Sequence, residues 1–172
     1  DLSIKIMTKT NERPMGFENM YGYDGFLIVS DEYIEKIGYI NITENIFKEN
    51  KDNILPTVKV FQKDDIIYLI GQEIRDNYNN TKKKKVFENF KKEYLLLKQK
   101  FSGNELNATL WFIDDNFKKN KRYFLSMSSS EKQLGLDMNI LYGGGLFLEI
   151  FHRMDVWKEF YTYFLKLKQE RS

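Results

Sequence analysis

The chain contains no cysteine and only one histidine, His152, and these two shortages exclude several kinds of site. Without cysteine there can be no disulfide, no zinc–thiolate centre and no cysteine nucleophile. The same composition is typical of a reducing compartment, so we expect a cytoplasmic protein. A single histidine excludes a multi-histidine metal centre. Because His152 follows an apolar helix end, we expect it to be a cation at a helix C-terminus and not a catalytic base.

Long apolar runs and a large excess of one charge are also absent. No stretch approaches the roughly 18 consecutive apolar residues of a membrane-spanning helix, and no signal-peptide pattern opens the chain, so we expect no membrane contact. The net charge is only +2, from 27 basic and 25 acidic residues. A nucleic-acid surface would therefore require segregation of charge. The run Gly143-Gly144-Gly145 lacks the Lys-Ser/Thr of a P-loop, which argues against a nucleotide triphosphatase.

Apolar and aromatic residues are plentiful, at 42% and 16% of the 172 residues. This composition argues against disorder, and the length is sufficient for one domain with a substantial core. We therefore expect residues 1–172 to form a single domain. Because the sequence opens with Asp1 and not with Met, we also expect it to be a fragment of a longer protein or a processed chain.

Hydrophobic periodicity predicts an α+β fold with a central mixed β-sheet that is built from hairpins and flanked by helices. Strands are expected at 2–6, 26–29, 34–42, 58–61, 66–74, 108–113 and 123–127. Helices are expected at 82–101, 137–151 and 155–168, the second being interrupted by the three glycines. The turn Lys63-Asp64-Asp65 would join the strands of one hairpin.

Two lysine-rich segments are candidates for binding phosphate. The first segment, Lys82, Lys83, Lys84 and Lys85, opens the long predicted helix, where cations are unfavourable and anions are favoured. The second segment consists of Lys118, Lys119, Lys121 and Arg122. If the fold brings the two together, they would contact a phosphate backbone, so DNA is the expected partner. The alternative interpretation is that both segments are solvated surface.

Glu73 and Arg75 lie on one side of the strand 66–74, because side chains alternate with a period of two. A carboxylate and a cation placed together can hold a divalent metal and stabilise the charge of a developing phosphorane. A plain salt pair at the end of a strand is the alternative. For Asp114 and Asp115, at the end of the strand 108–113, a capping or turn role is expected.

The arrangement resembles the PD-(D/E)XK nuclease superfamily, which includes many restriction endonucleases. Pro56-Thr57 opens a hairpin, Glu73-Ile74-Arg75 closes it, and a helix and a further strand follow. Leu141-Tyr142-Gly143, with Leu146-Phe147, looks like the helix start found in several restriction enzymes. The resemblance covers roughly residues 17–150. It implies a restriction-endonuclease-like fold and a metal-dependent endodeoxyribonuclease of a restriction system, which hydrolyses DNA phosphodiesters with Mg²⁺.

The resemblance also implies roles for particular residues. Glu73 would hold the metal, Asp24 or Glu18 would be the second catalytic acid, and Arg75 would stabilise charge. Asp24 would be the second metal ligand, although a plain turn at Gly22-Tyr23-Asp24-Gly25 is the alternative. The two lysine-rich segments would contact the DNA backbone.

Two differences from the family pattern favour another interpretation. Thr57 stands at the Asp position, and Arg75 at the Lys position, where arginine cannot give up a proton. A non-catalytic nucleic-acid recognition domain of a restriction or defence protein is therefore the second hypothesis. The third is an interaction domain without a nucleic-acid role. The stripe of Trp157, Tyr161 and Phe164 is expected in the core, and if it were exposed it would form a homodimer face.

Overall fold

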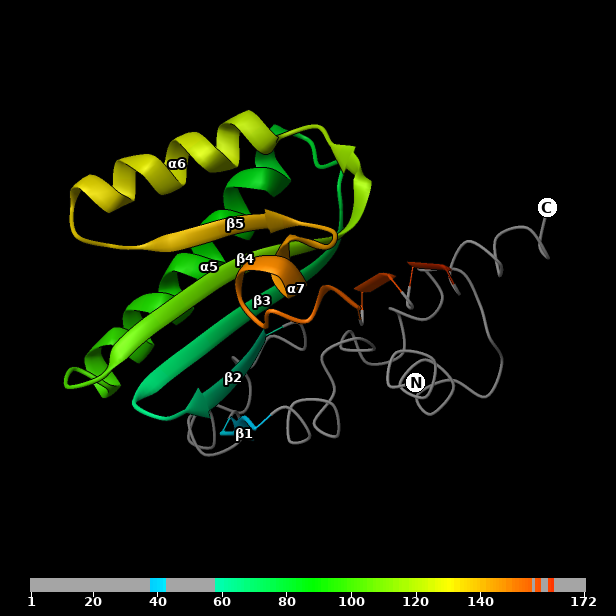
Figure 1. Ribbon diagram of the computed structural model, residues 1–172. Helices are drawn as coiled ribbons and strands as arrows, with labels where there is room; N and C mark the ends of the chain where they lie inside the picture. Colours follow the sequence, from blue (N-terminus) through cyan, green and yellow to red (C-terminus); the bar gives the residue numbers. More distant parts are fainter. Residues whose placement is uncertain (1–37, 43–57, 156, 159–160, 163–172) are drawn as a thin grey trace.

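A five-stranded mixed β-sheet in the order β1-β2-β3-β4-β5 organises the part of the chain that the structure describes (Figure 1). The structure is a computed structural model, and it describes residues 38–42, 58–155, 157–158 and 161–162. The strands are β1 (Ile40–Asn41), β2 (Val58–Lys63), β3 (Ile66–Asp76), β4 (Glu105–Lys118) and β5 (Met138–Tyr142). The helices are α5 (Asn80–Lys100), α6 (Lys121–Gln133) and α7 (Gly145–Glu149). The predicted α+β class, a mixed sheet flanked by helices, is confirmed.

The sheet has an antiparallel half and a parallel half. Strands β1, β2 and β3 pair antiparallel, and Asp64, with a φ of 55°, lies in the turn between β2 and β3. Aspartate tolerates this left-handed conformation better than most residues, so the predicted hairpin forms where its turn signal lies. Strands β3, β4 and β5 pair parallel. Each parallel connection requires a crossover, which α5 and α6 supply.

The segment 123–127, predicted as a strand, is instead part of helix α6, so that prediction is wrong. Its aromatic and apolar residues favour a strand locally, but the burial follows helical spacing. Phe124 and Glu131 are buried, whereas Leu125 is 44% exposed. The hydroxyl of Ser128 donates a hydrogen bond to the carbonyl of Met138 and so fastens α6 to β5. The need for a crossover between two parallel strands outweighs the local strand propensity.

The helix predicted over 137–151 is likewise wrong, because this segment divides into strand β5 and the short helix α7. Met138 and Ile140 are buried in the main core, which places alternate residues of β5 on one face of the sheet. Gly143 has a φ of 56°, a conformation that glycine adopts without strain. The glycine run therefore marks the end of a strand and not an interruption of a helix.

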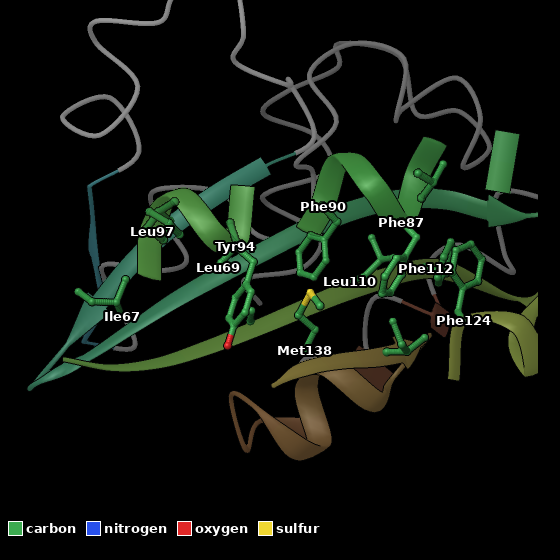
Figure 2. Close-up of a cluster of buried hydrophobic side chains, with 14 residues drawn as sticks. Ile67, Leu69, Phe87, Phe90, Tyr94, Leu97, Leu110, Phe112, Phe124 and Met138 are labelled. Atoms are coloured by element: carbon green, nitrogen blue, oxygen red, sulfur yellow. The ribbon is translucent and has the colours of Figure 1, made fainter. Parts of the chain in front are cut away.

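The main core fills the face of the sheet that α5 and α6 cover, and Figure 2 shows its side chains. It contains Val60, Ile67, Leu69, Val86, Phe87, Phe90, Tyr94, Leu97, Ala108, Leu110, Phe112, Phe124, Met138 and Ile140. Gly71 in β3 permits close packing of α5, because a Cβ there would lie 2.7 Å from Cδ1 of Phe90. Within the described ranges, no helix has both the length and the apolar character needed to cross a bilayer.

A second apolar cluster lies on the opposite face of the sheet. The ring of Trp111 in β4 packs against Phe147 of α7 and against Trp157, with centroid distances of 5.9 Å and 6.4 Å. Trp157 is buried and Tyr161 is half-buried, whereas Phe164 lies outside the described residues. The predicted core role of the aromatic stripe is therefore confirmed for Trp157.

Candidate nucleic-acid interface

The carboxyl ends of β3, β4 and β5 meet at one edge of the sheet, and most of the predicted functional residues of the described segments lie there. We call this region the C-terminal edge: residues 73–76 of β3, 114–118 of β4, Tyr142, and the first turns of α5 and α6. The strand register places Glu73 opposite Phe112 and Arg75 opposite Asp114. Asp24, Glu18 and Pro56-Thr57 lie outside the described residues. Both helices begin at this edge, because each follows a strand that ends there.

Asp76 is the buried centre of this edge. Its carboxylate accepts hydrogen bonds from the backbone N–H of Asn120 at 2.8 Å, from Nδ2 of Asn120 at 2.9 Å, and from the Tyr142 hydroxyl at 2.7 Å. Burial raises the pKa of Tyr142, and the Asp76 hydrogen bond raises it further, so the hydroxyl stays protonated and donates. Nδ2 of Asn120 also donates to the carbonyl of Tyr78 at 3.0 Å. One carboxylate thus joins β3, β5 and the start of α6.

The structure brings the two lysine-rich segments together. Nζ of Lys83, in the first turns of α5, lies 4.4 Å from the ring centre of Tyr123 in α6. Nζ of Lys121 lies 5.7 Å from the ring centre of Tyr142. The exposed members of the two segments are Lys82, Lys84, Lys85, Lys118, Lys119, Lys121 and Arg122. Positive charge from two distant parts of the sequence is therefore concentrated on one edge.

The N-terminus of α5 adds to this positive potential. Asn79 caps the helix, with Oδ1 accepting a hydrogen bond from the Lys82 N–H at 2.8 Å. The first turn of α5 contains no acidic residue. Each cation near a helix N-terminus costs about 0.3–1 kcal/mol, and an anion placed there relieves this repulsion. The end of α5 is therefore electrostatically suited to phosphate.

Glu73 lies close to the start of α5. Its Oε2 accepts a hydrogen bond from the Tyr78 hydroxyl at 3.0 Å. Burial raises the pKa of Glu73, while the Tyr78 hydrogen bond and the positive charge of Lys82 oppose this rise. The carboxyl group is thus held near a lysine of the first lysine-rich segment.

Arg75 makes its ion pair with the next strand. Its Nε lies 3.5 Å from Oδ2 of Asp114, and its guanidinium lies 5.0 Å from the ring centre of Phe117. Asp114 also accepts hydrogen bonds at 3.1 Å from the backbone N–H and from Nδ2 of Asn116, although β4 continues beyond it to Lys118. Glu73 and Arg75 share the end of β3, but each is held by a different neighbour.

The carboxylates of Glu73, Asp76 and Asp114 each accept a hydrogen bond or make an ion pair at this edge. Among the described residues, no group of three or more His, Cys, Asp or Glu side chains is arranged to hold a metal ion. The Asp76 carboxylate already accepts three hydrogen bonds, and Asp114 is paired with Arg75. A site at Glu73 would therefore need a further acid, such as Asp24 or Glu18.

The sequence patterns assigned no role to Asp76, Asn120 or Phe117, and they identified Tyr142 only as part of the motif Leu141-Tyr142-Gly143. Comparison with protein-family models, curated proteins and solved structures gives no match for this chain.

Proposed function

We propose that this domain binds nucleic acid through its phosphate backbone at the C-terminal edge. The observation that carries the proposal is the meeting of the two lysine-rich segments, next to a helix N-terminus whose first turn contains no acidic residue. The seven exposed cations there are carried by a chain whose net charge is only +2, which is the segregation that a phosphate-binding surface requires. Such contacts position the ligand and make binding salt-dependent without reading sequence.

Replacing Lys84 and Lys119 together by alanine tests this proposal. Each substitution removes one exposed cation, one from each lysine-rich segment, and leaves the hydrogen bonds of the Asp76 carboxylate intact. We expect DNA affinity to fall about tenfold or more near 100 mM salt. The slope of log Kd against log salt should become shallower by about two, since each lysine releases about one counterion. Fluorescence anisotropy of a labelled oligonucleotide at several salt concentrations measures both quantities.

The matched control is Lys92→Ala with Lys132→Ala. These exposed lysines lie on α5 and α6, away from the C-terminal edge, and their replacement changes the net charge by the same amount. Near-native affinity in the control supports a localised interface. An equal loss in both double variants, or wild-type binding that does not depend on salt, contradicts the proposal. Absence of any DNA binding would leave the interaction domain as the better hypothesis.

Hydrolysis of the bound phosphodiester with Mg²⁺, as in restriction endonucleases, is the second candidate function. It is favoured by the order of elements, in which the hairpin β2–β3 is followed by α5 and the parallel strand β4, with Glu73 near the exit of β3. Glu73 would hold Mg²⁺ together with Asp24 or Glu18, and Arg75 would stabilise charge. If the domain binds nucleic acid without hydrolysing it, it would be a recognition domain of a restriction or defence protein.

Incubation of supercoiled DNA with Mg²⁺, with Mn²⁺ or with EDTA separates these two candidates. We expect a nuclease to cut only with metal, and Glu73→Gln to abolish cutting while binding persists. The glutamine removes the negative charge but keeps an oxygen that can accept the Tyr78 hydrogen bond. Binding without cutting by the wild-type protein would support the recognition domain and contradict hydrolysis.

A further inference from the structure

Among the aromatic side chains of the described residues, Phe117 is the one that is exposed. It is 36% exposed, and the other large hydrophobic side chains with comparable or greater exposure in the described ranges are aliphatic. They are Ile40, Leu95, Leu125, Leu134 and Leu148. Phe117 directly precedes Lys118 and Lys119, so an open apolar ring lies within the positively charged edge.

The irregular end of β4 accounts for this exposure. In the pairing with β3, Arg75 lies opposite Asp114, but the next residue, Asp76, lies opposite Lys118. Residues 115–117 therefore have no partners in β3 and form a bulge. Bulges commonly redirect a side chain, and here the bulged segment contains the ring. Phe117 is thus presented at the rim of the sheet next to the lysines that follow it.

The ring and the Arg75 guanidinium lie together. The guanidinium carbon is 5.0 Å from the ring centre, and Nε of Arg75 is 3.5 Å from Asp114. The Arg75 side chain is itself 31% exposed. Aromatic rings and guanidinium groups are both surfaces on which unpaired nucleobases stack. The ion pair with Asp114 limits the movement of Arg75, so the combined surface is partly preorganised.

We propose that Phe117, supported by Arg75, stacks on an unpaired base of a single-stranded nucleic acid whose phosphates contact the adjacent lysines. This inference rests on the proposed function and names its substrate class. Bases within a duplex are already stacked on both faces and offer no free face to the ring. The stacking contact therefore contributes to the affinity for single strands and not to the affinity for duplex.

The test compares Phe117→Ala with wild type on a single strand that contains 2-aminopurine and on the corresponding duplex. Stacking on an aromatic ring quenches 2-aminopurine fluorescence, whereas contact with phosphates alone does not. We expect a loss of about tenfold in single-strand affinity and less than about twofold in duplex affinity. The quenching should disappear, and the salt dependence should stay unchanged because no phosphate contact is removed.

Phe117→Trp and Leu125→Ala provide the controls. The tryptophan keeps a stacking surface and should preserve both affinity and quenching. Leu125, 44% exposed on α6, is an apolar side chain whose removal should leave both unchanged. Circular dichroism establishes that each variant folds, and Phe117→Leu replaces the alanine variant if that one does not.

Each outcome distinguishes this inference from the proposed function. If the variant lacking the ring keeps single-strand affinity and quenching, or loses duplex affinity equally, the stacking inference fails while phosphate binding stands. If the wild-type protein binds neither single strand nor duplex, the proposed function fails as well. A selective single-strand loss together with the loss of quenching supports both.

Discussion

Asp76→Ala will lower the free energy of unfolding by about 3–5 kcal/mol, because it leaves several buried donors without their acceptor. The carboxylate is fully buried and accepts hydrogen bonds from the backbone N–H and Nδ2 of Asn120 and from the hydroxyl of Tyr142. Removing one partner of such a network costs more than a single exposed hydrogen bond. Urea denaturation followed by circular dichroism measures the change.

Two further variants make this result specific. Asp137→Ala removes an exposed carboxylate immediately before β5 and should change stability by less than about 0.5 kcal/mol. Asp76→Asn keeps one acceptor but directs an amide N–H₂ toward groups that donate, so its stability should fall between those of wild type and the alanine variant. A loss of under about 1 kcal/mol for Asp76→Ala would contradict the structural role assigned to this carboxylate.

DNA affinity should fall together with this stability. The carboxylate joins the end of β3 to the start of α6, so its removal loosens the contact between the two lysine-rich segments. At a temperature where the Asp76→Ala variant is still folded, we expect it to bind DNA more weakly than wild type, although all the lysines of the two segments are still present. Unchanged affinity would show that the two segments are held together by other contacts.

Trp111→Ala should lower the free energy of unfolding by about 3–5 kcal/mol, the cost typical of removing a large buried aromatic side chain. Trp111 is completely buried between Phe147 and Trp157, and its Nε1 donates a hydrogen bond of 2.7 Å to the carbonyl of Gly143. The variant loses ring packing and leaves the Gly143 carbonyl without this donor. Circular dichroism is the appropriate probe, because tryptophan fluorescence itself changes when one of the two tryptophans is removed.

Trp111→Phe separates packing from hydrogen bonding. The phenyl ring keeps most of the contact with Phe147 but cannot donate to Gly143, so a loss of about 1–3 kcal/mol is expected. If alanine and phenylalanine cost the same, the hydrogen bond and not the packing would dominate. If neither costs more than about 1 kcal/mol, the second apolar cluster would not contribute substantially to stability.

The sequence predicted the central part of the fold well, because that part has strong local signals. Alternating apolar residues identified the hairpin of β2 and β3, and its predicted turn contains Asp64, which adopts a left-handed conformation. The spacing of Val86, Phe90, Tyr94 and Leu97 identified α5, and all four are buried. The helix begins at Asn80, two residues before the predicted start, because Asn79 is the cap.

The two wrong predictions fall where tertiary structure outweighs local preference. Residues 123–127 have strand-forming side chains, yet they belong to the helix that must connect two parallel strands. Residues 138–142 were predicted as a helix, but Met138 and Ile140 face the same core with the period of a strand. A single sequence does not reveal that β4 and β5 are parallel, so it could not determine either segment.

The sequence predicted the charged residues of the candidate site, but not the residues that hold them in place. Glu73, Arg75 and the lysines were identified by strand alternation and charge clustering. The role of Asp76 was not predicted, because its contacts are with Asn120 and Tyr142, which are 44 and 66 residues away in the sequence. The exposure of Phe117 was not predicted, because the bulge at the end of β4 breaks the alternation of side chains from which its direction would be inferred. Both omissions arise from long-range geometry that leaves no local periodic signal.

The hairpin turn at Asp64-Asp65 gives the molecule a convenient point of attachment. Strand β3 has 11 residues, and at about 3.3 Å per residue it places this exposed turn roughly 35 Å from Asp76 at the far end of the strand. Exposed loop tips tolerate insertions better than other parts of a domain. A fluorophore or an immobilisation tag placed in this turn would therefore leave the lysine-bearing end of the sheet open to a ligand in solution.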